Sequence, residues 1–262
     1  MIGVAGCGRM GAPMLAALRD GGTNAIGFDV VDKDAAHIHT NLMQFAPHVE
    51  TLFSVVRDAD ETDTLLFGDQ NLMQTAPNLT RIFIGSTLSP RYVRDLRARV
   101  PDHITLIDAP MSGAQIAAQN RTLTFMLGGA QADIDDAIPL LALMGQHFHH
   151  MGAFGMGMQA KVLNNLLAAS HTAMTRLVLD WADAAGLDQD RLLALIATSS
   201  GQNWLASGYD SIEFARDGYA NDNSIGILVK DVAAALDAAP PDADQSLPKV
   251  VQSTIRALTP RH

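Results

Sequence analysis

Met1-Ile2-Gly3-Val4-Ala5-Gly6-Cys7-Gly8-Arg9-Met10-Gly11 is the segment that most clearly indicates the fold class. Its beginning is a short apolar run, and a Gly-x-Gly-x-x-Gly pattern follows at once. Apolar residues then recur at helical spacing until Gly21-Gly22 ends the pattern. A strand, a glycine turn and a helix in this order are typical of a dinucleotide-binding βαβ unit.

Each glycine of the pattern has its own physical task. The first permits a tight turn, the second lets the backbone approach a pyrophosphate, and the third lets the helix pack on the strand. The start of the helix offers backbone N–H groups and the positive end of its dipole to the phosphates. We therefore expect the cofactor to contact five residues of this turn, namely Gly6, Gly8, Arg9, Met10 and Gly11. A purely structural glycine turn is the alternative.

An acidic residue ends the second expected strand, at residues 24–29. Asp29 follows the first glycine by about 20 residues, the usual separation between the turn and a ribose-binding acid. A carboxylate there can accept both ribose hydroxyls and repels a 2′-phosphate, and the next residues, Val30 and Val31, supply no cation. The sequence thus favours NAD over NADP.

Strand and helix patterns alternate up to about residue 160. Further strands are expected at 52–56, 82–85, 104–107 and 122–127. A long helix is then expected from Lys161 to about Gly186, followed by helices at 189–197, 225–238 and 247–258. The predicted fold class is α/β, with an N-terminal Rossmann-type doubly wound sheet followed by an all-α C-terminal domain built on a long interdomain helix. We expect residues 1–160 to bind NAD, and residues 161–262 to serve substrate binding and oligomerisation.

Composition narrows the functional classes. The 262 residues carry a formal net charge of −10, which argues against binding to nucleic acid, where phosphate neutralisation supplies most of the affinity. No apolar stretch is long enough to cross a bilayer, and the first residues lack the features of a signal peptide. A single cysteine suits a reducing compartment. We therefore expect a cytoplasmic protein.

Small residues follow the strand expected at 104–107, in the segment Asp108-Ala109-Pro110-Met111-Ser112-Gly113-Ala114. Backbone N–H groups in such a segment can cradle an anion, and the Ser112 hydroxyl adds a donor. An ordinary proline and glycine turn is the alternative interpretation.

A second glycine-rich turn, at residues 155–157, leads into the long helix. Lys161 lies in the first turns of that helix, and Asn165 is four residues further on, on the same face. The helix dipole and partial burial would both lower the pKa of this lysine, toward the range useful for proton transfer. A solvated surface lysine is the alternative interpretation.

Together these motifs resemble the β-hydroxyacid dehydrogenase family, which includes 3-hydroxyisobutyrate dehydrogenase. The family's substrate signature is close to D-A-P-V-S-G-G, which residues 108–114 match, and its catalytic signature is G-x-G-x-x-x-K-x-x-N-N, which residues 155–165 match at every fixed position. Ser86-Thr87-Leu88-Ser89-Pro90 is similar to the family's strand end beside the nicotinamide, and Lys230-Asp231 is similar to its late Lys-Asp pair.

The resemblance implies a role for each matched residue. Lys161 would be the general acid/base at the substrate oxygen, and Asn165 would hydrogen-bond the substrate and steady Lys161. Ser112 and Gly113 would hold the substrate carboxylate. Thr87 and Lys230 would line the nicotinamide end of the cofactor. The implied activity is an NAD-dependent hydride transfer to or from a small 3-hydroxy acid.

The chain departs from the family pattern at several points. Arg121 and Ala114 stand where glycine is usual, the second being a small change in size, and Leu177 stands where glutamate is common. Arg121 could clamp a carboxylate or face solvent. The C-terminus looks short by roughly one helix. These departures leave open a tartronate or succinic semialdehyde reductase of the same family, and a non-catalytic dinucleotide-binding protein.

Further expectations concern metal binding, Cys7, the oligomeric state and the substrate. The run His147-Phe148-His149-His150 lacks a nearby cysteine or carboxylate to complete a metal site, so we expect no metal. Cys7 could have a lowered pKa at a helix N-terminus, or be a small residue that fits. The apolar face of the long helix predicts a homodimer or homotetramer, and the substrate is expected to be a small hydroxy acid or semialdehyde.

Overall fold

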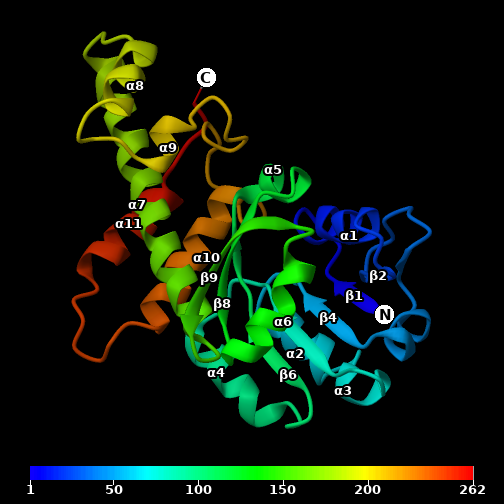
Figure 1. The fold of residues 1–262 in the computed structure, drawn as a ribbon. Helices are drawn as coiled ribbons and strands as arrows, with labels where there is room; N and C mark the ends of the chain where they lie inside the picture. Colours follow the sequence, from blue (N-terminus) through cyan, green and yellow to red (C-terminus); the bar gives the residue numbers. More distant parts are fainter. Residues whose placement is uncertain (262) are drawn as a thin grey trace. The chain divides into compact units, whose positions relative to one another are not determined.

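The structure is a computed structural model that describes residues 1–261 (Figure 1). The backbone divides into two compact units, Met1–Lys161 and Val162–His262. The first unit contains all the strands of the described chain, and the second is helical. The long helix α7 (Met156–Ala184) begins in the first unit and continues through the second.

A nine-stranded sheet forms the centre of the first unit. Its order is β3-β2-β1-β4-β5-β6-β8-β7, with β9 paired to β8. The strands from β3 to β6 run parallel, and β8 is antiparallel to β6. This is the predicted Rossmann-type sheet, and the predicted fold class is confirmed. The strands are β1 (Ile2–Ala5), β2 (Ala25–Phe28), β3 (Ile38–His39), β4 (Thr51–Ser54), β5 (Arg81–Ile84), β6 (Thr105–Asp108), β7 (Met111–Ser112), β8 (Leu123–Gly128) and β9 (Gly145–Gly152).

Helices cover both faces of this sheet. Alternate residues of each strand point to opposite faces, so neighbouring residues belong to different clusters. On β4, Phe53 belongs to the hydrophobic cluster that includes α1 (Gly11–Asp20) and α6 (Gln131–Leu141). Its neighbour Leu52 belongs to the cluster that includes α2 (Ala59–Leu66) and α4 (Pro90–Arg99). The remaining short elements are α3 (Leu72–Thr75), α5 (Ala114–Gln119) and two 3₁₀ turns, Leu42–Gln44 and Ala46–His48.

The sequence did not predict β3, β7 and β9. The first two have two residues each, too few for a periodic pattern. β9 reads Gly-Gln-His-Phe-His-His-Met-Gly and is mostly exposed. Its backbone pairs in parallel with β8, so hydrogen bonding to a neighbouring strand, and not an apolar pattern, places it in the sheet.

The helices expected after residue 160 are present. Besides α7, they are α8 (Gln189–Ala197), α10 (Ser224–Asp237) and α11 (Ser246–Arg256). The structure adds a short helix that the sequence did not predict, α9 (Trp204–Ser207). Side chains cap three of them, because Asp188, Asn203 and Asn223 accept hydrogen bonds from backbone N–H groups of the first turn.

A buried arginine joins distant segments of the second unit. The Arg176 guanidinium, on α7, donates to the carbonyl oxygens of Ala215 at 2.9 Å and Asp217 at 2.8 Å, and also to that of Thr259. Burial lowers the pKa of Arg176 from its ordinary value. Three carbonyl acceptors compensate for the lost hydration of the guanidinium, so this residue fixes the chain end against α7.

None of the helices in residues 1–261 is both long enough and apolar enough to cross a membrane.

Candidate functional site

The glycine turn after β1 has the shape that the sequence predicted. Gly6 has φ +87°, and a Cβ there would lie 2.6 Å from the Val55 carbonyl oxygen. A Cβ at Gly11 would lie 2.0 Å from the carbonyl oxygen of Gly6, so α1 can begin this close to β1 only with glycine. A Cβ at Gly8 would meet no described atom within 4 Å. Space beside Gly8 is the cradle that a bound pyrophosphate needs.

The start of α1 also fits a diphosphate. Its N-cap position is Met10, and no side chain among the described residues caps it with a hydrogen bond. The first turn of α1 holds no acidic residue, so no carboxylate opposes an anion there. Arg9 precedes it and is exposed. This turn therefore fits the diphosphate of a dinucleotide through backbone groups.

Asp29 follows the end of β2, as expected, and has a neighbour that sequence reasoning missed. Its Oδ1 accepts a hydrogen bond from the backbone N–H of Val31 at 2.9 Å. Its Oδ2 lies 3.5 Å from the Lys33 ammonium. Positions 30 and 31 carry no cation, but the loop turns back and brings the cation at position 33 to the carboxylate.

Cys7 is buried inside the glycine turn. Burial, followed by the nearby charge of Asp29, raises the pKa of the thiol to about 12. Burial thus acts against the alternative of a pKa lowered by the helix N-terminus. Cys7 is a small residue that fits, with its Sγ directed to the carbonyl of Val4 at 3.4 Å.

Asp108, at the end of β6, caps the long helix. Its fully buried carboxylate accepts hydrogen bonds from the backbone N–H groups of Gly155 at 2.7 Å and Met158 at 2.5 Å. Burial raises the pKa of Asp108 to about 6, and the donated N–H groups limit that rise. This capping contact explains why α7 begins at Met156, five residues before the expected start. Sequence reasoning assigned Asp108 no role of its own.

The glycines of the second turn are required by this carboxylate. A Cβ at Gly157 would lie 2.3 Å from the Met126 carbonyl oxygen and 2.9 Å from Asp108 Oδ2. A Cβ at Gly128, on β8, would lie 2.1 Å from Asp108 Oδ1. The first turn of α7 therefore approaches the sheet so closely that side chains are excluded around Asp108.

The predicted anion loop, residues 108–114, begins at the end of β6. Ser112 ends β7, and Gly113 has φ +129°. A Cβ at Gly113 would lie 2.3 Å from the Ala117 Cβ, so this loop turns tightly into α5. Ala114 has φ +55°, in the left-handed region that favours glycine. The expectation that Ala114 is a small change was wrong for the backbone, since alanine there is strained.

Thr87 follows β5, in a turn tied to the same helix. The Ser86 hydroxyl donates to the Val56 carbonyl at 2.6 Å. The backbone N–H of Leu88 donates to the Met158 sulfur at 3.3 Å. Within the first unit, therefore, the first turn of α7 touches both the end of β6 and the segment after β5. The glycine turn, Asp29 and Thr87 follow parallel strands and Asp108 ends one, so all of them lie at the sheet edge where α/β folds bind ligands.

Lys161 and Asn165 lie on α7, and both are buried, with relative exposures of 7% and 8%. Burial contradicts the alternative of a solvated surface lysine. Asn165 Nδ2 donates to Asp231 Oδ2, on α10, at 2.6 Å. The other oxygen of Asp231 lies 3.9 Å from the Lys230 ammonium, so the late Lys-Asp pair is adjacent to Asn165. Sequence reasoning missed this role of Asp231, because no local pattern connects two residues on different helices.

The departures from the family pattern lie mostly at the surface. Arg121 has φ +59° and pairs with Asp20 at 2.5 Å, with both side chains substantially exposed. Solvent exposure, and not a buried carboxylate clamp, is thus the environment of Arg121. Its positive φ explains why glycine suits the position. Leu177, on α7, is also exposed.

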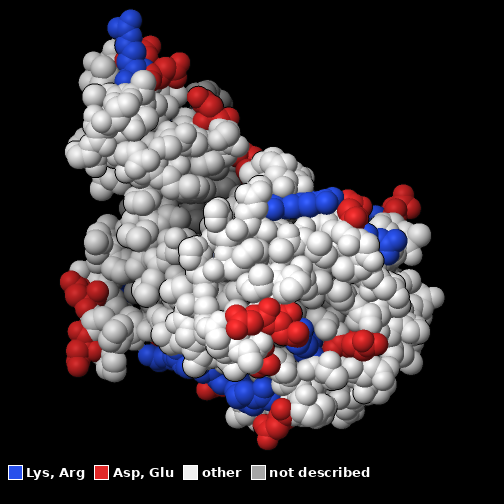
Figure 2. Space-filling model, in the orientation of Figure 1, with Lys and Arg blue, Asp and Glu red and all other residues white. Residues whose placement is uncertain are grey.

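The histidine run lies on β9. His147 and His149 are exposed on β9, and His150 hydrogen-bonds to Gln131 at 2.7 Å. Residues 1–261 include no group of three or more His, Cys, Asp or Glu side chains placed to hold a metal ion. On the face shown in Figure 2, charged residues of both signs are scattered over a largely uncharged surface.

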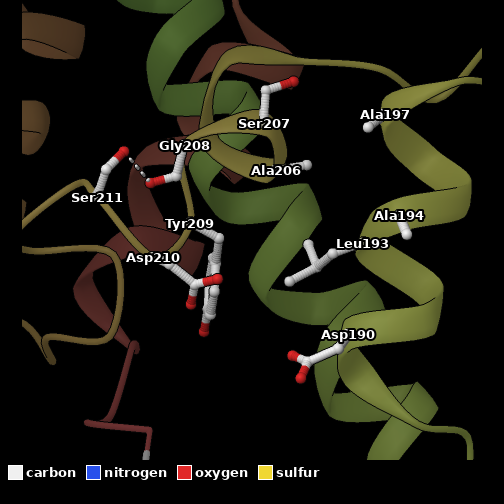
Figure 3. Close-up of a pocket in the computed structure, with 10 residues that line it drawn as sticks. All are labelled: Asp190, Leu193, Ala194, Ala197, Ala206, Ser207, Gly208, Tyr209, Asp210 and Ser211. Carbon is white, nitrogen blue, oxygen red and sulfur yellow. Dashed lines mark hydrogen bonds between the residues drawn. The ribbon is translucent and has the colours of Figure 1, made fainter.

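An open hollow of about 420 Å³ lies within the second unit, between α8 and the segment that follows α9 (Figure 3). Leu193 points into it from α8, and Asp190 and Asp210 lie at one end. None of the predicted site residues, all of which are described, lines this hollow. We do not place the site there, because the glycine turn, the anion loop and Lys161 all lie elsewhere.

Comparisons with known proteins identify the family of this chain. A family model for the NAD-binding domain of 6-phosphogluconate dehydrogenase matches residues 1–152, and one for the NAD-binding region of NADP-dependent 3-hydroxyisobutyrate dehydrogenase matches residues 155–258. The 3-hydroxyisobutyrate dehydrogenase of Pseudomonas aeruginosa is 30% identical over 245 residues, which cover 88% of this chain and 82% of that protein. The NAD-dependent L-serine dehydrogenase of the same organism is 29% identical, over 92% of this chain and 86% of its own length.

A solved structure shares the fold. The 3-hydroxyisobutyrate dehydrogenase of Mycobacterium tuberculosis, determined with L-serine, matches with a TM-score of 0.80 and 24% identity, covering 98% of this chain and 95% of that one. The chain belongs to the β-hydroxyacid dehydrogenase family. It is an NAD(P)-dependent oxidoreductase.

Proposed function

We propose that this protein transfers a hydride between NAD and a small 3-hydroxy acid, with Lys161 as the general acid/base. The observation that carries the proposal is the burial of Lys161 just after the capped first turn of α7. That turn contacts the segment that follows β5 and the end of β6, at the same sheet edge as the glycine turn. An amine in such a position, beside a dinucleotide-binding edge, is suited to exchange a proton with a substrate oxygen.

The proposal assigns a role to each residue predicted to contact the substrate or the nicotinamide. A bound nicotinamide supplies the hydride chemistry, and the protein positions the reactants. Lys161 accepts the proton of the substrate hydroxyl during oxidation and returns it during reduction. The Ser112 hydroxyl and the backbone N–H of Gly113 hold the substrate carboxylate. Asn165 hydrogen-bonds the substrate and steadies Lys161, and the nicotinamide end is lined by Thr87 and Lys230.

The substrate class follows from a shared chemistry. The relatives are named for 3-hydroxyisobutyrate and L-serine. Both molecules carry a hydroxymethyl group on the carbon next to a carboxylate, so one anion loop and one proton acceptor can serve either. A tartronate or succinic semialdehyde reductase activity is the alternative within the family, and a panel of hydroxy acids and semialdehydes distinguishes these substrates.

NAD is the proposed cofactor. Asp29 can bind the ribose hydroxyls and repels a 2′-phosphate, which supports NAD. Lys33, at 3.5 Å from that carboxylate, weakens this discrimination. Comparing kcat/KM for NAD and NADP with one substrate tests the preference.

The central experiment replaces Lys161 with alanine and measures cofactor binding and turnover separately. NAD binding, followed by fluorescence quenching, should be retained, because the glycine turn is untouched. Turnover should fall by about 10²–10⁴-fold, the usual contribution of a general acid/base. Undiminished turnover would contradict the role of Lys161. Wild-type protein that binds NAD but turns over no substrate of the panel would instead support a non-catalytic dinucleotide-binding protein.

A homo-oligomer, a dimer or a tetramer, is also part of the proposal. The exposed face of α7 carries an apolar stripe with residues spaced by three, four or seven positions, and their relative exposures range from 36% to 67%. The stripe consists of Leu163, Leu167, Met174, Leu177 and Trp181. This spacing is that of a helix-pairing seam, and so large an apolar stripe is typical of an interface.

Light scattering tests the oligomer. Leu167→Glu should lower the measured mass toward that of a monomer, because it places a charge in the seam. Leu195→Glu, at an exposed leucine of α8 outside the stripe, is the control and should leave the mass unchanged. A monomeric wild-type protein would refute this part of the proposal.

A further inference from the structure

Both the backbone and the side chain of Asp108 are held by hydrogen bonds. Its backbone is paired on one side with Ile84 of β5 and on the other with Gly128 of β8. The next residue, Ala109, donates its N–H to the Ile84 carbonyl at 2.9 Å. The carboxylate therefore projects from the end of an interior strand that is paired on both sides, and has little freedom to move with a helix that it contacts.

Two oxygens of this carboxylate have two different donors. Oδ1 accepts from Gly155 and Oδ2 accepts from Met158. Together they fix the first turn of α7 in position and in rotation about its axis, since a helix held at two points cannot roll. Lys161 is three residues after Met158, and a helix is rigid over one turn, so the same contacts set the direction from which the lysine side chain leaves the helix.

The same residue begins the anion loop. Ser112 lies four residues after Asp108, and the Pro110 carbonyl between them accepts a hydrogen bond from Met126 at 3.0 Å. Asp108 thus leads through its backbone into the loop proposed to hold the substrate carboxylate, and its own carboxylate holds the helix turn that carries the proposed acid/base. Displacement of a catalytic group by about 1 Å can cost about 10²-fold in rate.

We propose that Asp108 is a positioning residue of the reaction, whose carboxylate fixes the Lys161 amine relative to the Ser112–Gly113 loop. This inference rests on the proposed function, because it assigns Asp108 an effect that acts through Lys161. It differs from a purely structural role in one measurable respect. A structural residue changes the fraction of folded enzyme, whereas a positioning residue changes the rate of each folded, cofactor-bound enzyme.

The test is Asp108→Asn, with kcat expressed per NAD-binding site. Asparagine has the same size, but its Nδ2 faces one of the two backbone N–H donors, so one capping bond is replaced by a donor–donor conflict. We expect kcat per site to fall by about 10²-fold, and the Kd for NAD to stay within about twofold. Val93→Ala, in the buried core of α4, is the matched control, because it lowers stability without touching the cap. Its kcat per site should be unchanged.

A second variant approaches the same contact from the helix. Gly157→Ala forces a Cβ against the Met126 carbonyl and Asp108 Oδ2, so it must shift the first turn of α7. The same pattern of reduced kcat per site and retained NAD binding is expected, and this variant carries the test if Asp108→Asn does not fold. Met158→Leu, which removes only the sulfur acceptor of the Leu88 N–H, should have a smaller effect.

Parallel measurements on Lys161→Ala separate the two ideas. If Lys161→Ala loses turnover while Asp108→Asn and Gly157→Ala keep a wild-type kcat per site, the positioning role is refuted and the proposed function stands. If Lys161→Ala keeps turnover, the proposed function fails at its acid/base. Loss of turnover in all three variants with NAD binding retained supports both.

Discussion

The carboxylate of Asp108 accepts the backbone N–H of Gly155 at 2.7 Å, although 47 residues separate the two positions. This one hydrogen bond joins the end of β6 to the start of α7. It makes two segments with separate sequence patterns, an aspartate after a strand and a glycine-rich helix start, parts of one structure. Because the acceptor is a titratable carboxyl, we expect the stability of this structure to depend on pH.

The stability contributed by Asp108 should rise as the pH falls toward 5. Burial raises the pKa of this carboxyl from 3.8 to about 6, so between these values the native state holds a proton that the unfolded state has lost. The free energy of unfolding then falls as pH rises through about 6. Relative to Asp108→Asn, wild-type protein should gain about 1.4 kcal/mol between about pH 7.5 and pH 5. Urea unfolding of both proteins at the two pH values measures this gap, and a constant gap would contradict the raised pKa.

Cofactor choice should depend on two residues, not one. Asp29→Ser removes the charge that repels a 2′-phosphate and leaves Lys33 to attract it, so kcat/KM with NADP should rise by about tenfold, equivalent to about 1.4 kcal/mol. Lys33→Ala should lower the residual use of NADP by the wild-type chain. Steady-state kinetics with both cofactors provides the comparison. If Asp29→Ser leaves the ratio of the two kcat/KM values unchanged, discrimination lies elsewhere.

The fold was predictable where burial leaves a pattern. Buried parallel strands are short apolar runs, and α10 shows apolar residues at helical spacing, so sequence alone locates them within a few residues. β9 was missed because its residues are mostly exposed and backbone pairing alone defines it. The start of α7 was predicted too late, because the capping residue is Asp108, far away in the sequence. No capping residue next to the helix start indicates where the helix begins.

The candidate site was predictable residue by residue but not in its contacts. Motif spacing indicated Lys161, Asn165 and the glycine turn, since each lies in a short, dense pattern. The pairing of Asn165 with Asp231 spans 66 residues and two helices, and no periodicity encodes it. Contacts of this kind depend on how the helices pack.

Replacing Ala114 with glycine should stabilise the protein. The left-handed conformation at φ +55° destabilises alanine by about 1 kcal/mol, because its Cβ is strained there. Glycine has no Cβ and adopts this conformation without that strain. We expect the melting temperature to rise by roughly 2–4 °C. Ala117→Gly, in the interior of α5 at ordinary helical geometry, is the control and should lower it by a similar amount. A fall in melting temperature for Ala114→Gly would show that the backbone strain at this position is negligible.

Asp231 should control the orientation of the Asn165 amide. Asn165 donates its Nδ2 to the buried Asp231 carboxylate at 2.6 Å, which orients the amide so that Oδ1 is its acceptor. This oxygen accepts a hydrogen bond from Asn164 Nδ2 at 3.2 Å. Asp231→Ala removes this constraint and should reduce kcat/KM for the hydroxy acid by about tenfold or more, because a hydrogen bond to a charged group contributes about 1.5–3 kcal/mol. Asp231→Asn retains an acceptor oxygen and should lose less. Kinetics of both variants at saturating NAD gives the order of the effects. Equal losses in the two variants would mean that the charge of Asp231, and not the fixed amide of Asn165, is what the reaction requires.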